Sequence, residues 1–448
     1  MQLGSQHPDV VSPLPGRQGD RLLAALSAAE CPALTARRAR RAEASGALHD
    51  PIVWAQACGA NVVDSDGNRY VDLTAGFGAA AVGHRHPRVV AAIQRQSERL
   101  LHALGDVHPA DVKVQLLQRL AELAPFRGAR AMLGLSGSDA VEAALKTALL
   151  ATGRPGIVAF EGGYHGLGHG PLAACGYRSS LRAPFAGQLN PHVAFAPYPG
   201  RAGAAAADTL SAVMQCLKSG QLAVGAVLIE PVLGRGGIYA PPEGFMAVLA
   251  DLCRAHGALL VFDEVMTGLG RTGATWRAQR EGVEPDLVCA GKALGGGMPV
   301  SACLGRGAIM TAWGEPGSEA LHTGTFFGHP LGCAAALAAL DVLEGDQLAA
   351  AAARTGTWLL ERLRRCSEDH PCVRQVRGTG MMLGVELDSG RRALRVVRSL
   401  LERGYLTLTA GLDNEVLSLT PPLTIDRALL EGFACALEQC LERERRDA

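Results

Sequence analysis

One lysine follows an apolar run that has the composition of a buried strand. Lys292 stands in LVCAGKALGGGMP (287–299), directly before a cluster of glycines. A lysine at the end of a core strand either extends its amine to the surface or keeps it buried. Burial disfavours the charged amine, lowers its pKa toward neutrality and leaves a nucleophile. Lys292 is therefore a candidate for bonding to a carbonyl group.

An aspartate ends a second apolar run. Asp263 follows GALLVF (257–262). A carboxylate at this place must be paired, hydrogen-bonded or protonated, because burying it bare costs on the order of several kcal/mol. Two interpretations are open. Either Asp263 and Lys292 form one salt bridge at a strand edge, or they hold an aromatic nitrogen heterocycle between them. In the second case the aspartate keeps a ring nitrogen protonated and the lysine binds an aldehyde.

A turn of small residues forms a third polar feature. The segment RAMLGLSGSDAVEAALKTAL (130–149) turns at Gly137 and Ser138 and continues as a helix. Free backbone N–H groups and the positive end of a helix dipole favour an anion at such a turn. The same pattern also fits an ordinary capped helix.

Short apolar runs alternate with helix-length segments through the middle of the chain. This pattern predicts an α/β fold with a mostly parallel sheet covered on both faces. The carboxyl ends of parallel strands meet at one edge, where ligands bind, so we expect the polar residues named above to gather there. The runs are RAMLGLS, PGIVAF, AVGAVLIE, GALLVFDEV and PDLVCAGKA.

The two ends of the chain predict a smaller α+β domain. NVVDSDGNRYVDLT (61–74) is typical of a hairpin that turns at Asp66-Gly67. Helical stretches near 331–365 and 426–445 flank strands near 380–387 and 404–420.

The domain boundaries follow from these changes of pattern. We expect an N-terminal arm over residues 1–50, the first part of the small domain over 51–75, a large domain over 76–335, and the rest of the small domain over 336–448. The arm either docks on a partner subunit or is a frayed tail.

Composition narrows the partners. The 448 residues are 48% hydrophobic and 19% charged, as in a globular protein. Basic and acidic residues number 43 each, which argues against nucleic acid or an anionic membrane and favours a small molecule. The N-terminus has no signal-peptide pattern, and no apolar run approaches the roughly 18 residues of a membrane span, so we expect a soluble, cytoplasmic protein. The 12 cysteines are scattered singly, which predicts neither disulfides nor a metal site.

Pyridoxal phosphate is the heterocycle that requires a lysine, an aspartate, an anion site and a flat stacking surface together. From about Ala55 to Leu441 the chain resembles the class III pyridoxal-phosphate aminotransferases of fold type I, which include ornithine, 4-aminobutyrate and diaminobutyrate transaminases. The resemblance implies a large domain with a mostly parallel sheet and a small α+β domain. The matching motifs are GHRHP (83–87), SGSDAVEAALKTA (136–148), YHG (164–166), EPVLGRGG (230–237), DEVMTGLGRTG (263–273), GKALGGGMP (291–299), HTGTFFGHP (322–330) and RGTGMMLGVEL (377–387).

The resemblance implies roles for the residues that would touch the cofactor. Lys292 forms a Schiff base with pyridoxal 5'-phosphate and later moves a proton, and Asp263 keeps the ring nitrogen charged. Gly137 and Ser138 hold the phosphate. The remaining positions are Tyr164, which stacks on one ring face, Val265, which packs on the other, and Glu230, an acid that in relatives often engages a mobile arginine.

The resemblance also implies a homodimer with shared active sites. Thr325 matches a threonine that reaches the phosphate of the neighbouring subunit's cofactor. Whether dimers pair into tetramers is left open. We interpret His84, His86 and His165 as structural residues.

Three positions bear on the substrate. Phe77 lies where relatives place a residue of the substrate pocket. Leu167 stands where 4-aminobutyrate transaminases carry an arginine for a distal carboxylate, and Ser418 stands where many relatives carry an arginine for the α-carboxylate. Without these guanidinium groups a carboxylate loses its natural partner. Arg235 and Arg377 are candidates to supply the missing charge.

We therefore expect a ping-pong aminotransferase that moves an amino group from an amine donor to a keto-acid acceptor, with a donor other than 4-aminobutyrate. Diamines, amino sugars and amino alcohols are candidates. One alternative is an aminomutase, racemase or decarboxylase on the same fold. Another is a non-catalytic regulatory protein that binds the cofactor, which the presence of both Lys292 and Asp263 disfavours.

Overall fold

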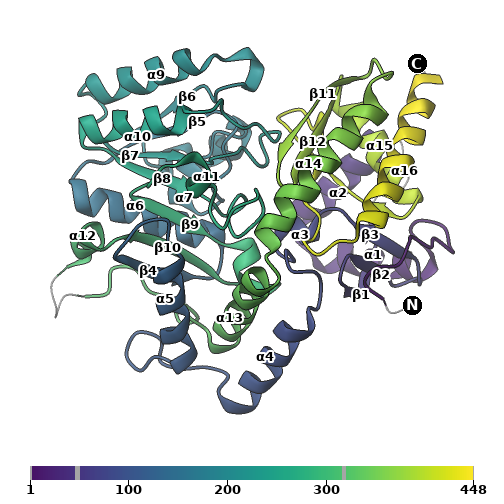
Figure 1. The fold of residues 1–448 in the computed structure, drawn as a ribbon, viewed down its shortest axis with the longest axis horizontal. Helices are drawn as coiled ribbons and strands as arrows, with labels where there is room; N and C mark the ends of the chain where they lie inside the picture. The colour runs from purple at the N-terminus through teal and green to yellow at the C-terminus, as the bar shows by residue number, and fades with distance from the viewer. Residues whose placement is uncertain (1–2, 46–50, 315–318, 447–448) are drawn as a thin grey trace. The chain divides into compact units, whose positions relative to one another are not determined.

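A computed structural model describes residues 3–45, 51–314 and 319–446 (Figure 1). The chain divides into two compact units. Pro87–Ala351 form the first, which we call the central unit, and Met1–His86 with Ala352–Ala448 form the second, the terminal unit. The four domain segments expected from the sequence stay a prediction. None of the described helices combines the length and the hydropathy that crossing a bilayer requires.

A seven-stranded sheet forms the core of the central unit. Its order is β4-β10-β9-β8-β7-β5-β6. The pairs from β9 to β6 are parallel, and β10 runs antiparallel to both of its neighbours. The prediction of a mostly parallel sheet is thus confirmed. The strands are β4 (Ala129–Gly134), β5 (Gly156–Phe160), β6 (Val193–Ala196), β7 (Val224–Ile229), β8 (Leu259–Asp263), β9 (Leu287–Ala290) and β10 (Ser301–Arg306).

Small apolar residues let one helix lie close against this sheet. Helix α6 (Gly137–Thr152) buries a row of alanines against β9 and β10, and its Ala140, Ala144 and Ala148 belong to the same cluster as Leu287 and Cys303. The other helices of the central unit are α4 (Pro87–Arg99), α5 (Asp111–Leu123), α7 (His169–Ala173), α8 (Ser179–Arg182), α9 (Ala206–Lys218), α10 (Phe245–His256), α11 (Arg277–Glu281), α12 (Gly307–Met310) and α13 (Pro330–Gly345).

Two four-stranded sheets form the terminal unit, in the orders β1-β2-β3-β13 and β11-β12-β15-β14. Strand β13 pairs parallel to β3, so residues from both ends of the chain share one sheet. The strands are β1 (Trp54–Cys58), β2 (Asn61–Asp64), β3 (Arg69–Asp72), β11 (Val373–Thr379), β12 (Met382–Leu387), β13 (Tyr405–Leu406), β14 (Leu408–Ala410) and β15 (Val416–Leu419). The helices are α1 (Arg17–Ala29), α2 (Pro32–Ser45), α3 (Ala75–Gly78), α15 (Gly390–Glu402) and α16 (Arg427–Arg446), while α14 (Leu348–Ser367) crosses the boundary between the units.

The predicted hairpin exists between β2 and β3. The Asp64 carboxylate accepts hydrogen bonds from the amides of Asp66 and Asn68, both at 2.9 Å, and Gly67 has φ +88°. Asp64 therefore holds the turn, and glycine supplies the left-handed conformation that the turn needs.

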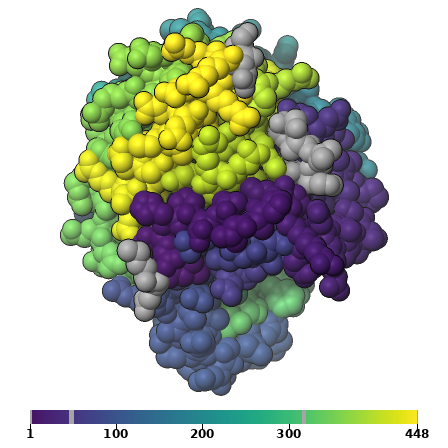
Figure 2. Space-filling view, turned by 90° about the vertical axis from the view of Figure 1, so that its right-hand side faces the viewer, coloured from purple at the N-terminus to yellow at the C-terminus, as the bar shows by residue number. Residues whose placement is uncertain are grey.

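The N-terminal segment is bound to this hairpin of its own chain. Asn61 Oδ1 accepts from the amides of Gly4 and Gln6, and Asp66 accepts from the amides of Gln18 and Gly19 at 2.7 and 2.8 Å. Figure 2 shows the segment (purple) as a band beside the C-terminal helix (yellow). Within residues 4–19 the segment is thus anchored and not frayed. Residues 1–2 and 46–50 of the expected arm lie outside the described part.

Candidate active site

Three polar residues meet where neighbouring parallel strands end. Glu230 follows β7, Asp263 closes β8, and Lys292 follows β9. Because the strands are parallel, their carboxyl ends lie at one edge of the sheet. The negative charges of Asp263 and Glu230 both act to raise the pKa of Lys292, so the two carboxylates lie near its amine. The structure therefore brings these three predicted site residues together.

Lys292 occupies an unusual backbone conformation. Its φ is +40°, in the left-handed region that residues with a side chain rarely adopt, and it begins the short 3-10 turn Lys292–Gly295. Such a conformation costs about 1 to 3 kcal/mol and persists where the surrounding structure enforces it. Gly291 meets that demand: a Cβ there would lie 3.3 Å from Val265 Cγ1. The turn fixes the direction in which the lysine side chain leaves the sheet.

Burial lowers the pKa of Lys292 below its ordinary value. The carboxylates of Asp263 and Glu230 oppose this shift, and the positive charge of Arg235 adds to it. A lowered pKa increases the fraction of neutral, nucleophilic amine near pH 7.

Asp263 is buried and pairs with a histidine. It is 3% exposed, and its Oδ2 lies 2.8 Å from Nδ1 of His165. Its Oδ1 accepts a hydrogen bond from the amide of Val265 at 3.0 Å. Within the described chain no ion pair joins Asp263 to Lys292, so the interpretation as a simple Asp–Lys salt bridge is wrong. One carboxylate is instead held in place for some other partner.

His165 was interpreted from the sequence as structural, and the contact with Asp263 gives it a place in the site. Its side chain is fully buried, and its Nε2 has no hydrogen-bond partner in the described part of the protein. The sequence contained one signal: a buried aspartate needs a donor, and His165 adjoins the predicted stacking residue Tyr164.

Glu230 positions two loops. Its Oε1 accepts from the amide of Tyr164 at 2.8 Å, and its Oε2 accepts from the amide of Gly234 at 3.0 Å. Burial, with the nearby charge of Asp263, raises the pKa of Glu230 to about 7, against the opposing influence of His165. The side chain is 5% exposed.

The turn before α6 is both a capped helix and a possible anion site. Ser136 Oγ accepts from the amide of Asp139 at 3.2 Å, and the Asp139 carboxylate accepts from the amides of Leu135 and Ser136. The amides of Gly137 and Ser138 have no hydrogen-bond partner within the described residues. Ser138 Oγ accepts from Gly168 N at 3.2 Å. Two free donors thus remain at the positive end of a helix.

Val265 packs against this turn. A Cβ on Gly137 would lie 2.8 Å from Val265 Cγ1 and one on Gly291 would lie 3.3 Å away, so all three backbones approach closely. Gly137, Val265 and Lys292 are therefore parts of one compact structure.

The other predicted residues lie apart from this group. Thr325 is exposed and has no hydrogen-bond partner among the described residues, and Leu167 is 52% exposed. Phe77, 67% exposed with φ +62°, and Ser418 belong to the terminal unit. Ser418 stands in β15 between Gly384 of β12 and Leu408 of β14.

Two further candidates from the sequence have their own contacts within the terminal unit. Arg377 forms an ion pair with Glu386 of the neighbouring strand and a hydrogen bond with Gln375 at 2.8 Å. Its charge is already compensated by an internal partner. The His84 Nε2 lies 2.8 Å from the buried Asp72 carboxylate, which agrees with a structural role.

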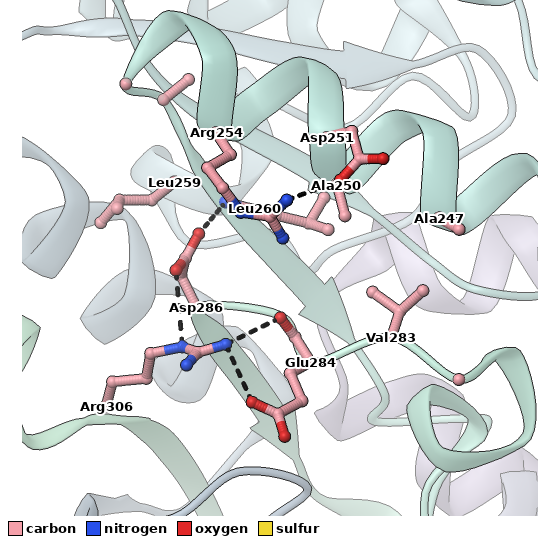
Figure 3. Close-up of a pocket in the computed structure, with 13 residues that line it drawn as sticks. Ala247, Ala250, Asp251, Arg254, Leu259, Leu260, Val283, Glu284, Asp286 and Arg306 are labelled. Carbon is pink, nitrogen blue, oxygen red and sulfur yellow. Dashed lines mark hydrogen bonds and ion pairs between the residues drawn. The ribbon is translucent and has the colours of Figure 1, made fainter.

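A large pocket lies at the opposite ends of the same strands (Figure 3). It has a volume of about 770 Å³, and Leu259 and Asp286, at the amino ends of β8 and β9, line it. Figure 3 shows Arg306 between Asp286 and Glu284, with nitrogen–oxygen distances of 3.6 and 3.3 Å. Since these charges neutralise one another, this pocket has none of the reactive features found at the carboxyl edge.

Glu264, next to Asp263, allows a prediction on stability. Its oxygens accept from the amides of Arg277 and Ala278 at 2.6 and 2.8 Å, at the start of α11, and burial raises its pKa from 4.5 to about 7. The folded protein therefore keeps this proton at a higher pH than the unfolded chain does. Stability that is present below pH 4.5 is lost as the pH rises through 7, by about 3 kcal/mol for such a shift.

We expect the Glu264→Gln variant to be less stable than the wild type at pH 5, because its amide group cannot accept all three hydrogen bonds. The stability difference should shrink as the pH rises to 8, since only the wild type loses the stability of the bound proton. Denaturant unfolding of both proteins from pH 5 to pH 8 measures this. A difference that stays constant or grows with pH contradicts the assignment.

Comparison with known proteins places these features in a wider context. The sequence matches the family described as Aminotransferase class-III over residues 42–441. An acetylornithine aminotransferase of Methanopyrus kandleri is 38% identical over 391 residues, 87% of this chain and 94% of that protein. A 4-aminobutyrate aminotransferase of Mycobacterium bovis is 35% identical over 94% of this chain and 98% of its own length. The structure of an ornithine aminotransferase from Toxoplasma gondii, with partial occupancy of pyridoxal phosphate at its active site, superposes with a TM-score of 0.80 at 31% identity, covering 89% of this chain and 93% of that one.

Proposed function

The chain belongs to the class III aminotransferase family, and on this premise we propose that it transfers an amino group from an amine donor without a tightly bound carboxylate to a keto acid. Its cofactor is pyridoxal 5'-phosphate. When bound, that cofactor accepts the electron pair released when the substrate carbon loses a proton. The observation that carries the proposal is the meeting of Lys292 and Asp263 at one edge of the sheet.

The residues at this edge fit the cofactor. An aldehyde needs a neutral amine, and burial lowers the pKa of Lys292. A protonated ring nitrogen needs a fixed carboxylate, and Asp263 is held by His165 and the Val265 amide. A phosphate needs free donors, and the amides of Gly137 and Ser138 at the start of α6 are unpaired within the described residues.

Each of these residues then has a definite task. Lys292 Nζ holds the cofactor covalently, is displaced by the donor amine, and takes the proton from the carbon that carries the amine. Asp263 keeps a positive charge on the ring nitrogen. His165 orients that carboxylate by its contact at 2.8 Å. Tyr164 and Val265 provide the two flat surfaces, and Glu230 fixes the backbone of Tyr164.

The donor class is inferred from two side chains. Leu167 is apolar and Ser418 is neutral, so neither position offers a guanidinium group to a substrate carboxylate. A bidentate arginine is the strongest partner a protein offers to a carboxylate. We infer that diamines, amino alcohols and similar amines are better donors than 4-aminobutyrate. Phe77 is our candidate for contact with the apolar part of the donor.

A panel of donors tests this proposal. The holoenzyme is mixed with each amine, and the absorbance change of the cofactor gives the kcat/KM of the first half-reaction. We expect 4-aminobutyrate to lie about 100-fold or more below the best carboxylate-free amine, in line with the loss of one charge-assisted contact. A value within 10-fold of the best amine contradicts the donor class. The absence of net transfer to both 2-oxoglutarate and pyruvate contradicts the reaction and favours a rearrangement or decarboxylation.

We further propose a cytoplasmic homodimer in which Thr325 of one protomer completes the phosphate site of its partner. Thr325 is exposed, and the apolar side chains of Leu321 and Phe326 beside it are 60% and 52% exposed. Apolar surface of this kind favours association. All 12 cysteines are free thiols, as expected in a reducing compartment.

A further inference from the structure

Arg235 extends from a loop whose backbone is held on both sides. The loop follows β7, and Glu230 at its start accepts from the amide of Gly234, directly before the arginine. On the other side, a Cβ on Gly236 would lie 2.5 Å from the carbonyl oxygen of Gly162, so the chain passes too close for any other residue. The base of the Arg235 side chain is therefore fixed relative to the site.

The guanidinium group of Arg235 lies over two aromatic rings. Its Cζ is 4.6 Å from the ring centroid of Tyr164 and 5.1 Å from that of Tyr177. Within residues 3–45, 51–314 and 319–446, Arg235 has no acidic partner and donates no hydrogen bond to a protein acceptor. An arginine held by ring faces alone keeps its N–H donors available.

Other arginines of the central unit differ in this respect. Arg201 pairs with Glu161 at 3.3 Å, Arg277 pairs with Glu281, and Arg306 pairs with Glu284 at 3.3 Å. A guanidinium group that is half-buried and unpaired loses hydration without a compensating anion. Such a group is maintained where an anion arrives from outside.

The charge of Arg235 acts on the site itself. It lowers the pKa of Lys292, which places the guanidinium group on the side of the reactive amine. A second guanidinium, that of Arg178, lies 5.0 Å from the ring centroid of Tyr177. The surroundings of these two tyrosines are thus cationic, which favours an anionic substrate group.

We propose that Arg235 binds the carboxylate of the keto acid in the second half-reaction and thereby determines which acceptors the enzyme takes. The inference rests on the proposed function, because it assumes that a keto acid occupies the site of Lys292. Every keto acid carries a carboxylate beside the reacting carbonyl, while an amine donor need not carry one. A planar guanidinium group matches a carboxylate in a bidentate geometry that lysine cannot reproduce. One arginine in this place allows the enzyme to accept both kinds of substrate in turn.

A purely structural role for Arg235, holding the ring of Tyr164, has different consequences. In that case the loss of Arg235 would disturb both half-reactions and lower the melting temperature. As a residue that binds the acceptor, Arg235 affects only the half-reaction with the keto acid. The two roles are therefore separated by measuring the half-reactions individually.

The test uses the holoenzyme and the variants Arg235→Met and Arg235→Lys, with Arg254→Met as the control. Arg254 is 72% exposed and lies at the other edge of the sheet. For Arg235→Met we expect the kcat/KM of the keto-acid half-reaction to fall about 100-fold, mainly through KM, while a carboxylate-free amine reacts within about 3-fold of the wild-type rate. Arg235→Lys should lose about 10-fold, and Arg254→Met should behave as wild type.

Binding of unreactive carboxylates gives a second readout that does not depend on turnover. Calorimetry with glutarate and propionate should show binding of at least one of them to the wild type, and about 100-fold weaker binding to Arg235→Met. Failure of the wild type to bind either carboxylate, or an equal loss in both half-reactions of Arg235→Met, would overturn the inference. A wild type that binds a carboxylate through Arg235 but transfers no amino group would instead contradict the proposed function alone.

Discussion

The Lys292→Ala variant is expected to lose transamination by about 10⁴-fold or more. The amine of Lys292 has two tasks, the covalent attachment of the cofactor and the movement of the proton, and each contributes substantially to the rate. The alanine variant should still fold, because Lys292 makes no ion pair within the described chain and its removal relieves the burial of an amine. Single-turnover measurements with the best donor amine, under saturating cofactor, quantify the loss.

Two controls sharpen this experiment. Lys292→Arg keeps a positive charge but not a group that can lose its proton near neutral pH, so it should be as inactive as the alanine variant. Lys218→Ala removes an exposed lysine at the end of α9 and should retain full activity. Retention of more than about 1% of the wild-type rate by Lys292→Ala would argue that another group performs the chemistry.

The Asp263→Asn variant is expected to lower the turnover rate about 10³-fold. Asparagine has the same size, so the packing beside Val265 is preserved, but it has no charge to keep a ring nitrogen protonated. Removal of one group that stabilises developing charge in a water-poor site has an effect of this size. The first half-reaction with a fixed donor should show the loss in kcat and little change in KM, because the donor does not touch Asp263.

A matched variant separates the charge of Asp263 from its position. In His165→Asn the carboxylate remains but loses the ring that lies 2.8 Å away. We expect a smaller loss, about 10-fold, together with a changed pH profile. If Asp263→Asn were no worse than His165→Asn, the charge on Asp263 would not be what the reaction requires.

The central sheet was predictable because its strands are apolar and bounded by turns. All five apolar runs of the middle segment became strands, from β4 to β9. The sequence did not reveal β6 or β10. Strand β10, SACLGR, has few β-branched residues, and its position depends on pairing with β4 and β9 from distant parts of the chain. Long-range pairing also joins β13 to β3, which no local pattern indicates.

The position of the site followed from topology. Polar residues at the ends of parallel strands must meet at one edge, which is why Glu230, Asp263 and Lys292 could be grouped before the structure was known. Loop geometry was not predictable in this way. The contact of His165 with Asp263 and the stacking of Arg235 on Tyr164 and Tyr177 depend on how two loops fold over the sheet. The sequence also left a salt bridge between Asp263 and Lys292 open, and the structure excludes it.

The measurement that tests the central claim most directly is the identification of the residue that holds the cofactor. Borohydride reduction fixes the bond between the lysine and the cofactor aldehyde, and peptide mass spectrometry then locates it. The chain has only four lysines, Lys113, Lys146, Lys218 and Lys292, so the assignment is unambiguous. We predict that the label is found on Lys292 in the wild type and is absent from the Lys292→Ala variant. A label on one of the other three lysines, or none on a protein incubated with pyridoxal phosphate, would contradict the account.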